Sequence, residues 1–246
     1  MINKELIKKR FSKCITTYDE NAKIQKRMAE KLFSLLERND FDKILEIGCG
    51  TGLLTKIAIE KLNFRTYTAN DIVGDCKDLI KQLSPEIKFI QADIEHIIKD
   101  SNNKYDLIIS NAVFQWIEDI DGFISTLYEK LEPNGVLLFS TFGLENFREI
   151  SFVLEKNLPY RSAKEYKTML KDYNFSVEEE AHILAFKTPK DILKHIQLTG
   201  VNAIDETKWT KSDMLNFEKG YNNFCSGRPT LTYNPIYIKI KNSTTD

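Results

Sequence analysis

Residues 4–38 have apolar positions at helical spacing and therefore read as helical. After them, along the first half of the chain, short apolar runs alternate with helical stretches. Strands that alternate with helices at this pitch predict βαβ units, and therefore an α/β fold with a mostly parallel sheet. The predicted strands are Lys43–Ile47, Arg65–Asn70, Ile87–Gln91, Tyr105–Ser110 and Gly135–Thr141.

The pattern changes after Phe142, where helical segments predominate. Strands are still predicted at Ala181–Lys187 and over the alternating run Leu231–Ile240. Because no low-complexity linker divides the chain, we expect a single domain over residues 1–246. Its lid would be the N-terminal helices, about 1–38, and its helical cap would lie within about 144–226. The helices expected in this region are 144–157, 163–172, 189–198 and 211–224.

A glycine-rich turn joins the first predicted strand to a predicted helix, Leu53–Leu62. Glycines allow a tight turn and a close approach of ligand to backbone, and the free amides of the helix start favour an anionic group. The Gly-x-Gly-x-Gly spacing of Gly48–Gly52 differs from the dinucleotide fingerprint and from the phosphate-binding P-loop. With Glu46 two residues before the first glycine, the turn resembles motif I of the class I S-adenosylmethionine (SAM) methyltransferases.

This resemblance implies a Rossmann-like fold, with a mostly parallel seven-stranded sheet whose last strand is antiparallel, plus a helical cap. It also implies SAM as cofactor and S-adenosylhomocysteine as product. Asp71, after the second strand, would accept hydrogen bonds from the ribose diol, with Asn70 as a competitor. Asp93, after the third strand, would cap the adenine amino group. Both aspartates could instead be turn or helix-cap residues. The implied cofactor-binding residues are Glu46, Gly48, Cys49, Gly50, Gly52, Asp71, Ile72, Asp93, Ile94, Asn111 and Ala112.

Two further segments are candidates for the acceptor side. Ser110–Trp116 follows the fourth strand and should lie between cofactor and acceptor, although Trp116 could instead be a core residue. Tyr18 lies on the edge of the N-terminal helical segment. It is either an ordinary buried tyrosine or part of a lid that presents it to the reacting methyl group and excludes water.

A cluster of basic residues lies beside the predicted lid. Such a cluster is either a solvated helix face or a landing patch for an acidic protein partner. The cluster comprises Lys4, Lys8, Lys9, Arg10 and Lys13.

Several segments together resemble the malonyl-acyl-carrier-protein O-methyltransferase family, which acts in biotin synthesis. The chain departs from the family pattern at Ile72–Cys76, which replaces the common Ser-Pro-x-Met-Leu, and at Gln197-Leu198, where a basic residue is usual. The trans-aconitate methyltransferases share the Ser-Asn-x-x-x-Gln-Trp signature, and both families esterify a free carboxylate. The segments that carry the resemblance are Arg10–Ser12, Tyr18–Ala22, Ser110–Trp116, Leu198–Gly200 and Leu231–Pro235.

The family resemblance implies methyl transfer to a malonyl thioester of an acyl carrier protein or of coenzyme A. A carboxylate is already ionised at pH 7, so no general base is required. An arginine suits the substrate carboxylate best. Arg228 is our candidate, with Arg148 and Arg161 in reserve, and Tyr18 and Trp116 complete the predicted catalytic set. A small-molecule methyltransferase and a SAM-binding protein without catalysis are the alternatives.

Composition narrows the remaining possibilities. The formal net charge of −1 argues against a general nucleic-acid binder. No apolar run reaches membrane-spanning length, and the N-terminus lacks the apolar core of a signal peptide. The four scattered cysteines and three histidines show no metal-ligand or disulfide spacing. We therefore expect no metal, no nucleic-acid partner, no membrane association and a location in the reducing cytoplasm.

Overall fold

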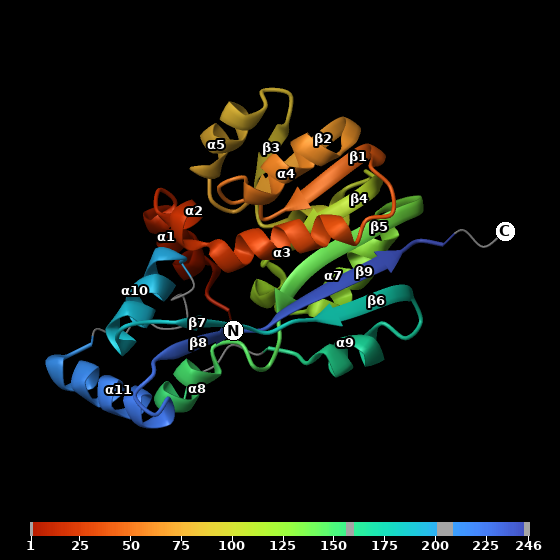
Figure 1. Ribbon diagram of the computed structural model, residues 1–246. Helices are drawn as coiled ribbons and strands as arrows, with labels where there is room; N and C mark the ends of the chain where they lie inside the picture. Colours follow the sequence, from red (N-terminus) through yellow and green to blue (C-terminus); the bar gives the residue numbers. More distant parts are fainter. Residues whose placement is uncertain (1, 156–159, 201–208, 244–246) are drawn as a thin grey trace.

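The computed structural model describes residues 2–155, 160–200 and 209–243, and its centre is a seven-stranded sheet (Figure 1). The strand order is β3-β2-β1-β4-β5-β9-β6. The strands are β1 (Asp40–Ile47), β2 (Asn63–Asp71), β3 (Lys88–Gln91), β4 (Tyr105–Ser110), β5 (Leu131–Phe142), β6 (Asn174–Glu179) and β9 (Pro235–Lys241).

Strand direction matches the expected fold class. The neighbours from β3 to β5 pair in parallel, while β9 runs antiparallel to both β5 and β6. The mostly parallel sheet with an antiparallel last strand is therefore confirmed. The carboxyl ends of β1, β2, β3 and β4 lie along one edge, where ligands of such sheets bind.

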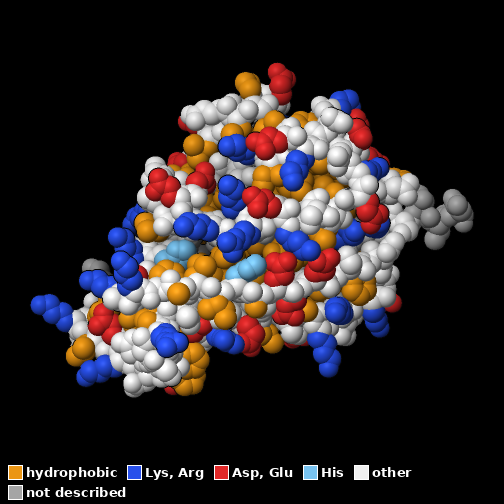
Figure 2. Space-filling view, viewed as in Figure 1, with side chains coloured by type: hydrophobic (Ala, Val, Ile, Leu, Met, Phe, Trp, Pro, Cys, Tyr) orange, Lys and Arg blue, Asp and Glu red, His pale blue; other side chains and the backbone are white. Residues whose placement is uncertain are grey.

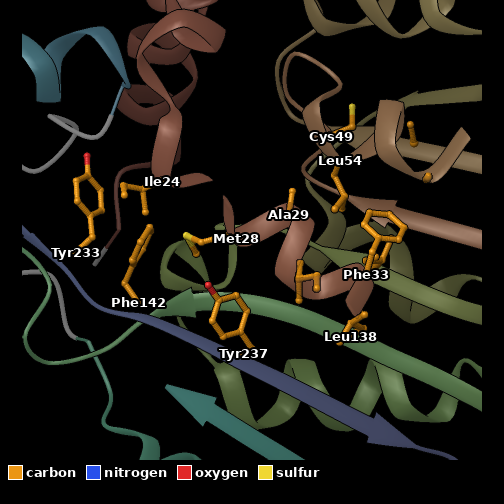
Figure 3. Close-up of a cluster of buried hydrophobic side chains, with 14 of the residues drawn as sticks. Ile24, Met28, Ala29, Phe33, Cys49, Leu54, Leu138, Phe142, Tyr233 and Tyr237 are labelled. Carbon is orange, nitrogen blue, oxygen red and sulfur yellow. The ribbon is translucent and has the colours of Figure 1, made fainter. Parts of the chain in front are cut away.

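Alternate residues of the central strands enter two hydrophobic cores on opposite faces of the sheet. Leu107 and Ile109 of β4 join the first core, whereas Ile108 between them joins the second. The first core receives α3 (Lys23–Ser34), α4 (Leu53–Lys61) and α5 (Cys76–Leu83), and part of it is drawn in Figure 3. The second core receives α6 (Ile94–Asp100), α7 (Ile120–Glu129) and α9 (Ala163–Met169).

The expected N-terminal helical segment is divided into α1 (Lys4–Cys14), α2 (Tyr18–Asn21) and α3. Ala22 ends α2 with a non-helical backbone (φ −81°, ψ 43°), so α3 starts in a new direction. The helical spacing in the sequence corresponds to the buried side of α3, where Ile24, Met28 and Leu32 are at most 1% exposed.

The region after β5 forms the cap in the lower left of Figure 1, where a second, two-stranded sheet lies among helices. This sheet pairs β7 (His182–Ala185) with β8 (Thr230–Tyr233) in antiparallel fashion. Positions 156 and 157 of the expected helix 144–157 fall outside the described residues. The cap helices are α8 (Arg148–Leu154), α10 (Pro189–Leu198) and α11 (Lys211–Phe224).

One expectation about the last strand is wrong. The run Leu231–Ile240 is not a single strand, because β8 belongs to the small sheet and β9 to the large one. The chain passes between them at Asn234, whose side-chain amide donates to Glu179 Oε1 (3.1 Å) and to the Glu180 carbonyl (2.9 Å). Pro235 has no N–H for a continuous ladder. Strand β6, at the sheet edge, was not predicted.

No helix within the described ranges combines the length and the apolar character needed to span a membrane.

Candidate functional site

The glycine turn between β1 and α4 has a backbone that side chains would not tolerate. Gly48, Gly50 and Gly52 have φ values of 68°, 52° and 89°, in the left-handed region that favours glycine. A Cβ on Gly48 would lie 2.3 Å from Val113 Cγ2, and one on Gly50 would lie 3.2 Å from Phe11 Cζ. The turn is therefore packed between the segment after β4 and the N-terminal helix α1.

Asp71 closes the glycine turn from the end of β2. Its Oδ2 accepts a hydrogen bond from the Gly50 amide (2.8 Å), and its Oδ1 accepts one from the Val73 amide (2.9 Å). Burial raises the pKa of the carboxyl group, and the amide hydrogen bonds lower it in part. Neighbouring Asn70 donates to the carbonyls of Ile90 and Ala92, so its side chain ties β2 to β3. Each Asp71 oxygen keeps a lone pair for a ligand.

Asp93 has two roles in the structure. It is the N-cap of α6, where Oδ1 accepts the Glu95 amide (3.1 Å), and its Oδ2 accepts Lys4 Nζ (2.7 Å). Lys4 also pairs with Glu95. The cap interpretation and the ligand interpretation are therefore compatible. The ion pair holds α1 over the carboxyl end of β3, a contact that sequence reasoning did not find.

A cavity of about 150 Å³ lies at the carboxyl ends of β1 to β4, under α1 and α2. All the implied cofactor-binding residues except Glu46 and Gly52 line it. The N-terminal helices contribute the opposite wall. The lining includes Lys4, Ile7, Phe11, Tyr18, Gly48, Cys49, Gly50, Asp71, Ile72, Asp93, Ile94, Asn111, Ala112 and Trp116.

Glu46 lies beneath the turn and not in the cavity wall. The side chain is fully buried, and its Oε2 accepts hydrogen bonds from Thr55 Oγ1 and Tyr67 OH, both at 2.6 Å. Burial raises the pKa of Glu46 to about 7, although the two hydrogen bonds oppose this shift. Because Thr55 is on α4 and Tyr67 is on β2, Glu46 fixes the elements on both sides of the turn.

The segment after β4 is fixed by a short polar network. Asn111 Nδ2 donates to the Gln25 carbonyl of α3 (2.9 Å), and its Oδ1 accepts Ser140 Oγ from β5 (2.7 Å). Ala112 has a left-handed backbone (φ 56°) and donates its amide to Ser140 Oγ (3.0 Å). Trp116, in the short 3-10 helix η1 (Phe114–Trp116), is half-buried in the cavity wall.

Tyr18 lines the cavity from α2 and packs edge-on against Phe11, with ring centroids 5.1 Å apart. Burial raises its pKa above the ordinary value, so the phenol keeps its proton at neutral pH. Burial also raises the pKa of Tyr233, and the nearby Tyr18 and Tyr160 raise it further. Tyr233 shares a 2.8 Å hydrogen bond with His195 Nε2. Tyr18 and Tyr160, from distant parts of the chain, are therefore both electrostatic neighbours of Tyr233.

A second cavity, of about 510 Å³, lies beside the first at the ends of β4 and β5. Ile117 lines both cavities, and η1 lies at the boundary between them. Gln115 lines the second cavity and donates from Nε2 to the Ala112 carbonyl (2.6 Å). This cavity was not predicted, and its polar lining comprises Gln115, Glu118, Thr141, Tyr160, Arg161, Glu165 and Tyr166.

The three candidate arginines lie in different environments. Arg228 is exposed in the turn before β8 and lines neither cavity. Arg148 is paired with Glu145 at 3.2 Å. Arg161 is half-buried and lines the second cavity. The structure therefore brings Tyr18 and Trp116 together at the first cavity but leaves Arg228 outside both.

The first cavity fits SAM. Gly48 and Gly50 line the cavity with backbone alone, so a ligand there meets the turn without an intervening Cβ. Asp71 and Asp93 face the cavity from the ends of adjacent strands. Their oxygens match the hydroxyl and amino donors of an adenosine, and the glycine turn suits the methionine part.

Comparisons with known proteins agree with this site. Residues 18–180 match the family described as "Methyltransferase domain". The malonyl-[acyl-carrier protein] O-methyltransferase of Calditerrivibrio nitroreducens is 40% identical over 240 residues, which is 95% of each chain. The protein of the same name from Chlorobium luteolum is 34% identical, over 98% of this chain and 96% of its own.

Solved structures share the fold at low sequence identity. A putative methyltransferase from Bacillus halodurans matches 88% of this chain and 99% of its own, with a TM-score of 0.63 and 14% identity. A coclaurine N-methyltransferase bound to N-methylheliamine and S-adenosylhomocysteine has a TM-score of 0.55 and 15% identity, over 88% of this chain and 72% of its own. These structures show the fold, and the family match together with the 40% identical relative identifies a methyltransferase that uses SAM.

Proposed function

This chain belongs to the malonyl-[acyl-carrier protein] O-methyltransferase family of SAM-dependent enzymes, and we propose that it methylates the free carboxylate of a malonyl thioester. The observation that carries the proposal is the 40% identity over 95% of both chains. The product would be the methyl ester of the thioester, made for the first step of pimeloyl synthesis toward biotin. We propose that residues 1–246 act as one domain in this reaction.

In the proposed complex, Asp71 accepts the ribose hydroxyls and Asp93 accepts the adenine amino group. The amides of Ile72 and Ile94 lie beside these acids, and the turn Gly48–Gly52 cradles the methionine part. Glu46 acts through Thr55 and Tyr67, by holding the turn in place. Asn111 and Ala112 form the floor between cofactor and acceptor.

The chemistry needs alignment and the exclusion of water. Bound SAM supplies an electrophilic methyl group on a sulfonium. A carboxylate oxygen of the acceptor would take this methyl group in a direct displacement, with S-adenosylhomocysteine as the leaving group. A malonyl carboxylate is ionised at neutral pH, so no protein base is needed, and none of the three histidines lines either cavity. Tyr18 and Trp116 would hold the reacting groups in line and keep water out, and alignment of this kind contributes up to about 7–11 kcal/mol.

The proposed protein partner is an acyl carrier protein, with coenzyme A as the alternative carrier. Lys and Arg side chains gather over α1 and α10 on one side of the molecule (Figure 2). Exposed members of this basic surface are Lys9 and Lys13 of α1 and Lys190 and Lys194 of α10. Carrier proteins are acidic, so docking here would weaken as salt screens the charges.

The partner assignment is tested by charge reversal. Lys9→Glu combined with Lys13→Glu should slow turnover of the carrier-protein thioester more than that of the coenzyme A thioester. Lys9→Glu and Lys13→Glu are also measured singly, and Lys77→Glu, at an exposed position of α5, is the control for one charge reversal. Equal losses on both thioesters would contradict docking at this surface.

The reaction itself is tested by incubating the protein with methyl-labelled SAM and each malonyl thioester in turn, that of an acyl carrier protein and that of coenzyme A, followed by treatment with base. A methyl ester releases labelled methanol under base, whereas a methyl group on carbon stays bound. Base-stable label, or no transfer, would overturn the proposed activity. We also propose a cytoplasmic location, since Cys14, Cys49, Cys76 and Cys225 are free thiols.

A further inference from the structure

We propose that Arg161 holds the acceptor carboxylate, in the second cavity, with the Tyr160 hydroxyl as a further donor. The inference rests on the proposed function and adds the residue that recognises the charge of the substrate. It replaces Arg228 as the candidate for this role, because Arg228 is exposed and outside both cavities.

The position of the second cavity fits an acceptor site. It lies at the ends of β4 and β5, against η1, and it adjoins the first cavity at Ile117. Thr141, near the carboxyl end of β5, forms part of its wall. A carboxylate bound here can approach the first cavity at Ile117, which lines both. This is the edge of the sheet at which substrates of α/β enzymes bind.

Arg161 is available for an anion. Its half-buried side chain makes no hydrogen bond or ion pair with any residue in the described parts of the chain. A guanidinium has five donors in a planar fork that matches a carboxylate. A cation in a partly dry cavity therefore favours a carboxylate there.

The two acidic residues of the cavity are already engaged. Glu165 Oε2 accepts the amide and the hydroxyl of Ser162, both at 2.7 Å, in the capping box of α9. These hydrogen bonds lower the pKa of Glu165, and Arg161 is the smaller cause of that shift. Glu118 Oε1 accepts the Ile2 amide at 2.6 Å. Both carboxylates keep their negative charge, and Arg161 acts on Glu165 electrostatically without a direct ion pair. The fork of the Arg161 guanidinium is therefore open to a ligand carboxylate.

Tyr160 supplies a neutral donor beside this cation. Its hydroxyl oxygen accepts Asn146 Nδ2 at 2.9 Å, which leaves its own proton for another acceptor. Asn146 is fully buried, and its Oδ1 accepts the Asn234 amide (3.2 Å), so the orientation of the amide group is fixed. Burial raises the pKa of Tyr160, which keeps the phenol protonated as a donor.

Two acceptors that differ only in charge test whether Arg161 recognises the carboxylate. A variant that merely misfolds would lose affinity for both acceptors, whereas loss of recognition changes their ratio. Malonyl-coenzyme A carries the free carboxylate, and propionyl-coenzyme A has a methyl group in its place. Binding of each is measured by calorimetry in the presence of S-adenosylhomocysteine, so that no turnover occurs. The wild type should prefer the malonyl thioester, and Arg161→Gln should reduce that preference by about 10- to 100-fold, as expected for a hydrogen bond between charged groups.

Three variants complete the test. Arg161→Lys should retain part of the preference, because it keeps the charge without the fork. Arg228→Gln and Arg148→Gln should leave it unchanged, and SAM affinity should be equal in all four variants. The inference is overturned if Arg161→Gln still prefers the malonyl thioester. It is also overturned if the wild type shows no such preference, or if Arg228→Gln loses it. If the wild type fails to release labelled methanol, the proposed function fails; if it succeeds and Arg161→Gln keeps the preference, this inference alone fails.

Discussion

The two cavities are built in different ways. One wall of the first comes from the segments at the carboxyl ends of β1, β2, β3 and β4, so most of its proposed cofactor-binding residues lie at or just after a strand end. Its opposite wall comes from α1 and α2. The second combines Ile2, residues near η1, the end of β5 and the start of α9. Local chain order thus determines the cofactor side, whereas the acceptor side depends on how distant segments pack.

The polar groups of the two cavities also differ in what holds them. Asp71 is fixed by the backbone amides of Gly50 and Val73, which any sequence with this turn would supply. Tyr160 is fixed by the side chain of Asn146. A site held by backbone amides can bind the same cofactor in enzymes of different sequence. The acceptor site is held by side chains of the cap, so substitutions there can change which acceptor binds.

The largest effect is expected at the cofactor side. Asp71→Ala removes the proposed ribose acceptor and leaves two buried amides without a partner, so the SAM dissociation constant should rise by about 100-fold. Calorimetry measures this change, and Asp78→Ala, at an exposed position of α5, is the control. Unchanged affinity would show that the ribose site lies elsewhere.

A mutation at the acceptor side should separate the two cavities. Gln115→Ala removes a polar group of the second cavity, so the KM for malonyl-coenzyme A should rise by about tenfold. The SAM dissociation constant should change by less than about twofold. If SAM binding weakens as much as acceptor binding, the hydrogen bond from Gln115 to Ala112 couples the two cavities. The cofactor and acceptor sites would then not be independent.

A pH series on Glu46 tests the rigid support of the glycine turn. The folded-state pKa of about 7 exceeds the ordinary value of 4.5, so the contribution of Glu46 to stability is full below pH 4.5 and is lost as pH rises through 7. The melting temperature of Glu46→Gln minus that of the wild type should therefore increase by about 5–10 °C between pH 5 and pH 8.

Glu60→Gln, on the exposed side of α4, controls for this measurement. Parallel melting curves for Glu46→Gln and the wild type across the series would show that Glu46 is not held protonated in the fold.

The smallest effect is expected at the N-terminal segment, where Ile2 lines the second cavity and Lys4 lines the first. Lys4→Gln breaks the ion pairs with Asp93 and Glu95, whose side chains are 21% and 18% exposed. Partly exposed pairs contribute little, so SAM affinity should fall only about two- to fivefold, and the loss should shrink at high salt. A loss that is independent of salt would mean that Lys4 acts by packing and not by charge.

Much of the molecule could be predicted from the order of its residues. The strand–turn–helix pattern, the Gly48–Gly52 turn and the acids Asp71 and Asp93 were located because each depends on a few neighbouring residues. Strand β6 was missed because its apolar positions are few and it lies at the sheet edge. The break between β8 and β9 was missed because the alternation continues through Asn234.

The sequence alone therefore determined the fold class and the residues that follow each parallel strand, because local periodicity and turn chemistry decide these. The resemblance of the Glu46–Gly52 turn to a methyltransferase motif indicated the cofactor. Only the tertiary structure placed Lys4 against Asp93, 89 residues away, and Arg161 in a cavity with Gln115. It also showed that Arg228 is exposed and lines neither cavity. Such contacts depend on how the lid and the cap fold back over the sheet, and no local pattern of side chains encodes that packing.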